Sequence, residues 1–213
     1  MKVCLIVLFV AIIGVLEVSG HGMVMNPVNR GSIWRVYGTG AADPDYNDNG
    51  NFCGGFYVQH SINGGKCGLC GNDFRDPMPR AHENGGKYGK GFVVANYPRG
   101  ATIPVSVQIT ANHLGYFYLN LCNLDTYGRE SEACFAAYSL KTSSGSTKYY
   151  LNSAAVGYYN FTVTLPAGVS CKRCVLQWTY TTGNNWGYCD DGSGKLGCGD
   201  QENFRTCSDI SIS

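Results

Sequence analysis

Eleven cysteines in a chain of 213 residues constrain the fold more than any other feature of this sequence. Cys4 lies in an apolar run, residues 3–16, that follows a basic start and precedes a small residue at Gly20. This pattern is typical of a secretory signal peptide, residues 1–20. The run is shorter than the ~20 residues that span a bilayer, and an uncleaved anchor is the alternative. Cleavage after Gly20 would leave ten cysteines, an even number that favours five disulfides in a secreted protein.

The remaining cysteines include two C-x-x-C pairs, Cys67/Cys70 and Cys171/Cys174. Zinc ribbons place their pairs about 15–20 residues apart, whereas roughly 100 residues separate these two. A redox-active C-x-x-C would need a neighbouring βαβ pattern, and the sequence has none. We therefore expect structural disulfides, and the spacing does not say which cysteines pair.

The composition narrows the class of protein. Charged residues make up only 15% of the chain, below the typical ~25%, while 13% are aromatic. The aromatic content excludes a disordered chain, and the lack of long charged helical runs excludes a coiled coil. A net charge of +1 gives no electrostatic basis for binding nucleic acid or an acidic membrane.

The sequence predicts one all-β domain over residues 21–213 with little helix. Residues 26–90 are rich in Gly, Asn, Asp and Pro and are predicted to form a long loop, with a short helix at 56–61. Further along, apolar and polar residues alternate with the period of half-buried strands. Short strands bounded by turns indicate an antiparallel sandwich. The expected strands are 102–110, 116–122, 158–165, 174–181 and a closing strand at 209–212.

Two of the four histidines carry the functional hypothesis. Cleavage after Gly20 would make His21 the first residue, whose amine and imidazole nitrogens can chelate one metal ion. His113 follows the most regular predicted strand and could supply a third nitrogen. An all-nitrogen set of this kind suits copper(II). His60 and His82 lie in loop sequence and are expected to be structural.

The whole mature chain resembles the arthropod-type lytic polysaccharide monooxygenases of auxiliary-activity family fifteen. The motifs that carry this resemblance are His21-Gly22, NRGSIWR at 29–35, YNDNGNFCGG at 46–55, NGGKCGLCGND at 63–73, PRAHENGGKYGKG at 79–91, TANHLGYF at 110–117 and CGDQENFRTCSDISI at 198–212.

The resemblance implies specific site residues. It assigns one copper ion to His21 and His113, and the small axial residue to Ala111. Phe204 falls where the family has an axial Tyr or Phe, so no phenol oxygen is available there. Glu202, two residues earlier, is a weaker candidate for a group beside the copper ligands.

The resemblance also implies an immunoglobulin-like or fibronectin-like sandwich that cleaves crystalline chitin or cellulose oxidatively, at C1 of the sugar. A small-molecule or protein reductant would convert copper(II) to copper(I), which activates O2 or H2O2. We expect a secreted monomer with no nucleic acid or membrane partner. The residues themselves support the redox reading only by elimination, because no pair of carboxylates stands out for hydrolysis.

Two other functions remain open at this stage: a non-catalytic copper-binding or copper-carrying protein, and a carbohydrate-binding module whose histidines are incidental. Binding to a flat crystal face would need exposed aromatic side chains, whereas Trp178 is expected in the core. Asn160 begins the chain's one N-x-S/T glycosylation sequence. The candidate surface aromatics are Trp34, Tyr37, Tyr46, Phe52, Tyr57, Trp186 and Tyr188.

Overall fold

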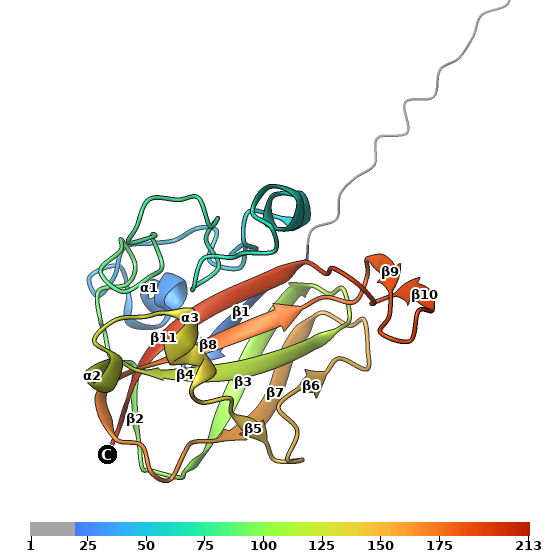
Figure 1. The fold of residues 1–213 in the computed structure, drawn as a ribbon. Coiled ribbons are helices and arrows are strands. Elements are labelled where there is room, and N and C mark those ends of the chain that lie inside the picture. The colour runs from blue at the N-terminus through green and yellow to red at the C-terminus, as the bar shows by residue number, and fades with distance from the viewer. Residues whose placement is uncertain (1–19) are drawn as a thin grey trace, which may run out of the picture.

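The computed structural model of the chain describes residues 20–213 (Figure 1). Residues 1–19 of the expected signal peptide, with Cys4 among them, lie outside the described residues. None of the described helices is long and apolar enough to cross a membrane. The described residues form two sheets that pack face to face, together with a small separate hairpin.

The first sheet has four strands in the order β1-β3-β7-β5, and the second has five in the order β2-β11-β8-β4-β6. All pairs are antiparallel except the short parallel pair of β2 with β11. The bounds are β1 (His21–Asn26), β3 (Thr102–Ala111), β7 (Gly157–Thr164) and β5 (Lys141–Thr142) in the first sheet, and β2 (Ala95–Tyr97), β11 (Asn203–Ile212), β8 (Cys171–Thr181), β4 (Tyr116–Asn123) and β6 (Tyr149–Tyr150) in the second.

The core follows directly from the alternation read in the sequence. On β3 the apolar side chains turn inward and are at most 1% exposed, because every second residue of a strand faces the same side. They pack against inward-facing Leu119 on β4 and Trp178 on β8, which confirms that Trp178 belongs to the core. Burial of these large apolar side chains supplies most of the energy that holds the two sheets together.

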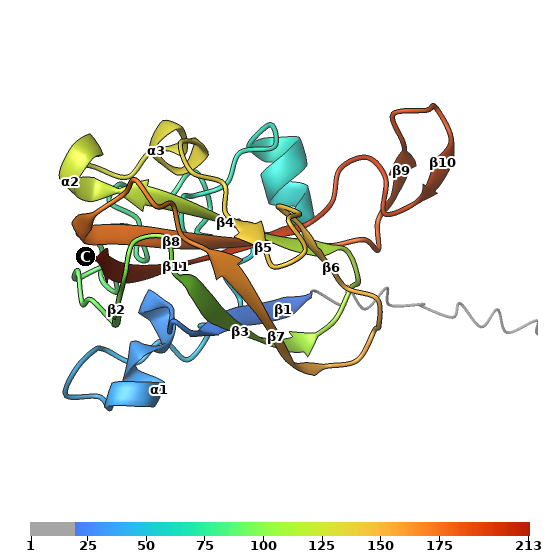
Figure 2. The ribbon, with the colours of Figure 1, turned by 90° about the horizontal axis from the view of Figure 1, so that it is seen from below.

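The part of the long segment between β1 and β2 that contains Leu69 and Cys70 lies against the outer face of the five-stranded sheet, whereas α1 (Ile33–Tyr37) lies beside β1 (Figures 1 and 2). The segment contains more helix than the single short one at 56–61 that the sequence predicted. Besides α1, it contains a 3-10 helix (Arg30–Ser32) and a π-helix (Val58–Ile62), the last close to the predicted helix at 56–61. Two further short helices, α2 (Leu124–Tyr127) and α3 (Glu132–Ala136), follow β4.

Five disulfides join the ten described cysteines, which confirms their structural role. Cys70–Cys207 ties the long loop to β11 across 137 residues, and in the chain-entropy view a closure of this length stabilises the fold by roughly 4–5 kcal/mol. The other bridges are more local: Cys53–Cys67, Cys122–Cys134, Cys171–Cys174 and Cys189–Cys198.

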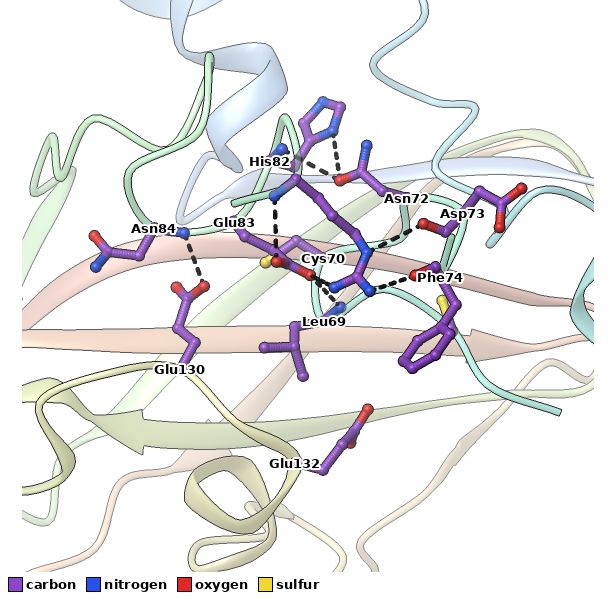
Figure 3. A network of polar contacts seen from close by, with 12 residues as sticks. Leu69, Cys70, Asn72, Asp73, Phe74, His82, Glu83, Asn84, Glu130 and Glu132 are labelled. Carbon is purple, nitrogen blue, oxygen red and sulfur yellow. Dashed lines mark hydrogen bonds and ion pairs between the residues drawn. The ribbon is translucent and has the colours of Figure 1, made fainter. Parts of the chain in front are cut away.

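A buried polar network also fixes the long loop in place (Figure 3). The carboxylate of Glu83 accepts hydrogen bonds from the backbone amide of Leu69 at 2.9 Å and from Arg80 at 2.8 Å. The backbone amide of Asn84 donates a hydrogen bond to the carboxylate of Glu130 at 2.8 Å, and Glu130 also forms an ion pair with Arg30. Because buried charges are tolerated only when paired, these contacts define one position for the loop on the sheet.

Strands β9 (Trp186–Tyr188) and β10 (Gly194–Leu196) form a hairpin that stands away from the sandwich (Figures 1 and 2). The Cys189–Cys198 bridge closes it. The hairpin follows β8, at the end of the sandwich where β1 begins and β3 finishes. It therefore projects from the end that carries His21.

The sequence predicted strands β3, β4, β7 and β8 within a few residues, but it missed or shortened other strands. Strand β1 was not predicted, and the closing strand begins at residue 203 rather than 209. No strand was predicted for the hairpin of β9 and β10.

Candidate metal centre

His21 begins β1 and lies opposite Ala111, the last residue of β3. The register shifts between His21 and Gly22, and the amide of Gly22 instead donates to the carbonyl of Asn49 at 3.1 Å. Gly22 sits in the core, where an added Cβ would approach the Cδ1 of Ile109 to 2.5 Å. The sequence His-Gly therefore allows the strand to start close against the core, with the His21 side chain at the end of the sandwich.

His113 lies in the tight turn that joins β3 to β4. Asn112 accepts a hydrogen bond from the amide of Leu114 at 2.8 Å, and Leu114 and Gly115 both have positive φ. A Cβ at Gly115 would come within 2.1 Å of the carbonyl of Thr181, so only glycine fits at this position. The backbone thus fixes the direction in which His113 points.

Two hydrogen bonds hold the backbone of His113 itself. Its amide donates to the hydroxyl of Tyr180 at 2.9 Å, and its carbonyl accepts from the amide of Gly183 at 2.9 Å. Burial raises the pKa of the Tyr180 hydroxyl, so this phenol stays protonated over the ordinary pH range. The His113 backbone is therefore anchored to β8 and to the segment that leads into the hairpin.

His113 and Phe204 both lie close to Gly20, the residue that precedes His21. A Cβ at Gly20 would lie 3.2 Å from the Nδ1 of His113 and 3.2 Å from the Cε2 of Phe204. The rings of His21 and Phe204 lie 6.3 Å apart between centroids. The structure therefore brings His21, His113, Ala111 and Phe204 together at one end of the sandwich.

The Nδ1 of His113 is buried and has no hydrogen-bond partner among the described residues. Burial lowers the pKa of this imidazole below its ordinary value, and the neighbouring His21 lowers it further. A neutral imidazole offers a lone pair, and a buried nitrogen without a partner costs free energy that a metal ion would recover. This is the observation on the chain itself that fits a bound metal.

The donor set also fits copper. No group of three or more His, Cys, Asp or Glu among the described residues could hold a metal ion, so a site here needs a donor of another kind. Cleavage of the Gly20–His21 bond would convert the nitrogen of His21 into a primary amine and remove Gly20 from the space beside His113. Two imidazoles and one amine are nitrogen ligands of the type that copper(II) prefers.

Phe204 lies beside this centre and is fully buried. Its ring stacks on the ring of Tyr180, with 5.7 Å between the centroids, and lies edge-on to the ring of Phe52, with 6.3 Å between the centroids. The ring carries no oxygen, so it limits space next to the histidines without offering a ligand. Its place on β11 next to β8 makes it part of the core as well as of the site.

A hollow of about 610 Å³ opens beside His21. Glu202 lies within it and is only 7% exposed, whereas Tyr57 at its margin is 66% exposed. The hollow thus combines a sheltered carboxylate with an accessible aromatic ring beside His21. The other residues that line it are Phe52, Gly54, Gly55, Phe56, Val58, Asn184 and Asn185.

The aromatic residues suggested for the substrate surface differ in their exposure to solvent. Trp186 and Tyr188 on the hairpin are 60% and 69% exposed, and their rings lie 5.0 Å apart. Tyr46 is 83% exposed and Tyr37 is 46% exposed, whereas Trp34 and Phe52 are half-buried. The hairpin pair is attached to the end of the sandwich that carries the histidines.

His60 and His82 have structural contacts, as expected. The Nε2 of His60 lies 2.9 Å from the carbonyl of Gln201. His82 is buried, with its Nε2 2.7 Å from Asp45, and its side chain also contacts Asn72 (Figure 3). Neither was found to lie with His21 and His113.

Sequence reasoning missed Tyr180 as the residue that holds His113. The available signal was its position on the inward face of β8, because a buried tyrosine normally finds a hydrogen-bond partner for its hydroxyl. The identity of that partner, 67 residues away, could not be read from the sequence.

The chain is similar to known proteins both in sequence and in structure. A family model described as lytic polysaccharide mono-oxygenase, cellulose-degrading, matches residues 21–210. The chain is also similar to the solved structure of a lytic polysaccharide monooxygenase AA15 from Thermobia domestica in the Cu(I) state, with 45% identity and a TM-score of 0.85. That similarity covers 90% of this chain and 98% of the other. No curated protein sequence matches the chain.

Proposed function

Because this chain belongs to the lytic polysaccharide monooxygenases, as a member of auxiliary-activity family fifteen, we propose that it cleaves crystalline chitin or cellulose oxidatively. The enzyme is copper-dependent, with one copper ion per chain, and acts on polysaccharide with an external reductant. The choice between chitin and cellulose, oxidation at C1, and O2 or H2O2 as oxidant belong to the proposal.

The proposed copper ligands are His21, through its imidazole and its amine, and His113 through its imidazole. The single observation that carries this assignment is the buried, unpartnered Nδ1 of His113 beside Gly20 and near His21. Processing after Gly20 is part of the proposal, with residues 1–20 as the signal peptide and 21–213 as the catalytic domain. Five disulfides support secretion, because disulfides persist in oxidising compartments.

When bound, copper supplies one-electron redox chemistry that activates the oxidant for attack on a C–H bond beside the glycosidic link. The protein's own residues prepare the site for this chemistry. Tyr180 holds the backbone of His113, so the imidazole is oriented before the metal binds. Ala111 and the ring of Phe204 restrict the space beside the ligands, and Phe204 provides no competing oxygen donor.

The surface around His21 suits an uncharged, flat substrate. The chain has a net charge of +1, so binding to a neutral polysaccharide meets no strong charge field. Trp186 and Tyr188 offer adjacent exposed rings on a disulfide-closed hairpin, and Tyr57 offers another beside the hollow. We assign these three rings to contact with the sugar faces of the crystal. The protein acts as a monomer in this proposal, with no nucleic acid or membrane partner.

The decisive experiment incubates the mature, copper-loaded protein with chitin and with cellulose in the presence of ascorbate. We expect oxidised oligosaccharides in mass spectra, with C1 products as lactones or aldonic acids, and none without copper or ascorbate. His113→Ala should abolish these products. His60→Ala is the matched control, because it removes a histidine that has only structural contacts.

The alternatives predict different outcomes. A copper carrier would bind copper tightly but release no oxidised product from either polysaccharide. A simple binding module would bind the polysaccharide with no copper affinity, and the His113→Ala variant would then behave as the wild type in a copper titration.

A further inference from the structure

Strand β7 carries a feature that the copper chemistry does not use: Asn160-Phe161-Thr162, the one N-x-S/T sequence of the chain. Such a sequence accepts an N-linked glycan when a protein passes through a eukaryotic secretory pathway. A strand is an unfavourable place for a glycan if the Asn side chain points into the core. The structure decides which way this side chain points.

Asn160 points to solvent. Its side chain is exposed, while the adjacent Phe161 packs against the core between the two sheets. On the outward face, Ser106 lies directly opposite on β3, and Thr162 and the exposed Tyr158 lie two residues to either side of Asn160. A glycan attached here needs no rearrangement of the strand, because successive side chains of a strand leave on opposite faces.

The same part of β7 is also a free edge of the first sheet. Strand β3 pairs with β7 from residue 157 to residue 164, but β5 pairs on the other side only with Val163 and Thr164. No strand within residues 20–213 pairs with 157–162 on that second side. Exposed Tyr158 and Val156, which are 58% and 62% accessible, add apolar surface beside it. An unpaired edge of this kind can pair with another chain unless something covers it.

We propose that Asn160 carries an N-linked glycan that stands on the solvent face of β7 and covers this free edge. The inference rests on the proposed secretion, but it does not depend on copper. Asn160 lies opposite Ser106, five residues before Ala111 on β3, or about 16 Å along the strand. The glycan therefore leaves the histidine end of the sandwich open to a polysaccharide surface.

The test uses the full-length chain secreted by insect cells and recovered from the medium. Thr162→Ala and Asn160→Gln each remove the acceptor sequence, and Thr162→Ser is the matched control that keeps it. We expect the wild type and Thr162→Ser to carry a glycan that peptide N-glycosidase removes, converting residue 160 to Asp. Thr162→Ala and Asn160→Gln should have the unmodified mass. A secreted wild type with unmodified Asn160 overturns the inference.

A second measurement tests whether the glycan covers the free edge of β7. On slow heating, light scattering should rise at a lower temperature for Thr162→Ala and Asn160→Gln than for Thr162→Ser. If scattering rose at the same temperature for all variants, the proposal that the glycan covers the edge of β7 would be overturned. Copper titration and product release should be the same for all of them. A secreted protein that binds copper and oxidises polysaccharide but has no glycan would overturn this inference alone and leave the proposed function standing.

Discussion

The backbone amide of His113 donates a hydrogen bond of 2.9 Å to the hydroxyl of Tyr180, a residue 67 positions away on β8. The ring of Tyr180 in turn stacks on Phe204, whose ring lies 6.3 Å from that of His21. One buried tyrosine thus connects the turn that carries one proposed ligand to the aromatic ring beside the other. The proposed copper site is therefore tied to the core of the sandwich through Tyr180 and Phe204.

Replacing Tyr180 with Phe should therefore weaken copper binding without removing a ligand. Loss of the hydroxyl leaves the part-buried amide of His113 without its partner, which costs about 1 kcal/mol of unfolding free energy. Outer partners of metal ligands typically contribute about 10- to 100-fold in affinity, so we expect a reduction in that range by calorimetric titration. Tyr57→Phe, at an exposed ring, is the control and should change neither quantity. Equal copper affinity in Tyr180→Phe and wild type would show that Tyr180 does not position His113.

Removal of His113 should have a larger effect. His113→Ala takes away a proposed ligand, so the loss of copper affinity should exceed the roughly 100-fold attributed to outer partners. Circular dichroism should still show a folded β protein, because His113 lies in a turn outside the main core cluster. His60→Ala should retain full copper affinity, and a comparable loss in both variants would contradict the assignment.

The exposed ring pair on the hairpin should matter for substrate and not for metal. We expect Trp186→Ala combined with Tyr188→Ala to weaken binding to insoluble polysaccharide by about tenfold, equivalent to about 1.4 kcal/mol. The depletion of protein from solution by chitin or cellulose measures this. Tyr150→Ala removes a ring of similar exposure, 57%, from β6 and is the control. If the double variant binds polysaccharide as the wild type does, the hairpin is not part of the substrate surface.

A strand could be predicted from the sequence only where its own residues carry the signal. Strand β3 was predictable because its one face is buried and the other is not, so its sequence alternates. Strand β11 was recognised only at its end because the long loop covers its outer face and buries polar residues there. Asp209 on that face is paired with Arg30, and Ser208, which alternates to the inner face, donates to the carbonyl of Pro27. Such partners come from distant parts of the chain, so local sequence does not reveal them.

The proposed site rests on a different kind of sequence signal. The position of His21 after a cleavage signal, and of His113 after a regular strand, were local features of the sequence. The disulfide pairing and the contact of Tyr180 with His113 were not, because both depend on how the strands are ordered in the sheets. The family resemblance is confirmed by the family model over residues 21–210 and by the similarity to the solved AA15 structure.

The buried pair of Asp45 and His82 predicts how acid affects the long loop. Burial alone raises the pKa of the Asp45 carboxyl, but hydrogen bonds from His82 and from the amide of Asn47 outweigh it and lower the pKa below its ordinary value. A carboxylate with a lowered pKa stabilises the folded state above about pH 4, and this contribution is lost as the pH falls through the lowered value.

We therefore expect the melting temperature of the wild type to fall more steeply than that of Asp45→Asn between about pH 5 and pH 3. Asp43→Asn, which changes an exposed carboxylate two residues earlier, should follow the wild type. Differential scanning fluorimetry over this range measures the three slopes. Identical slopes for wild type and Asp45→Asn would show that this carboxylate does not contribute to acid sensitivity.

The central claim is that copper is bound by the freed amine and imidazole of His21 together with His113. Its most direct test is a copper titration of two chains that differ in one residue, one that begins at His21 and one that retains Gly20. The chain that begins at His21 should bind one copper ion tightly. The chain with Gly20 should lose affinity by more than the roughly 100-fold typical of an outer partner, because the amine is replaced by a peptide nitrogen. Equal affinity of the two chains would contradict the proposed copper centre.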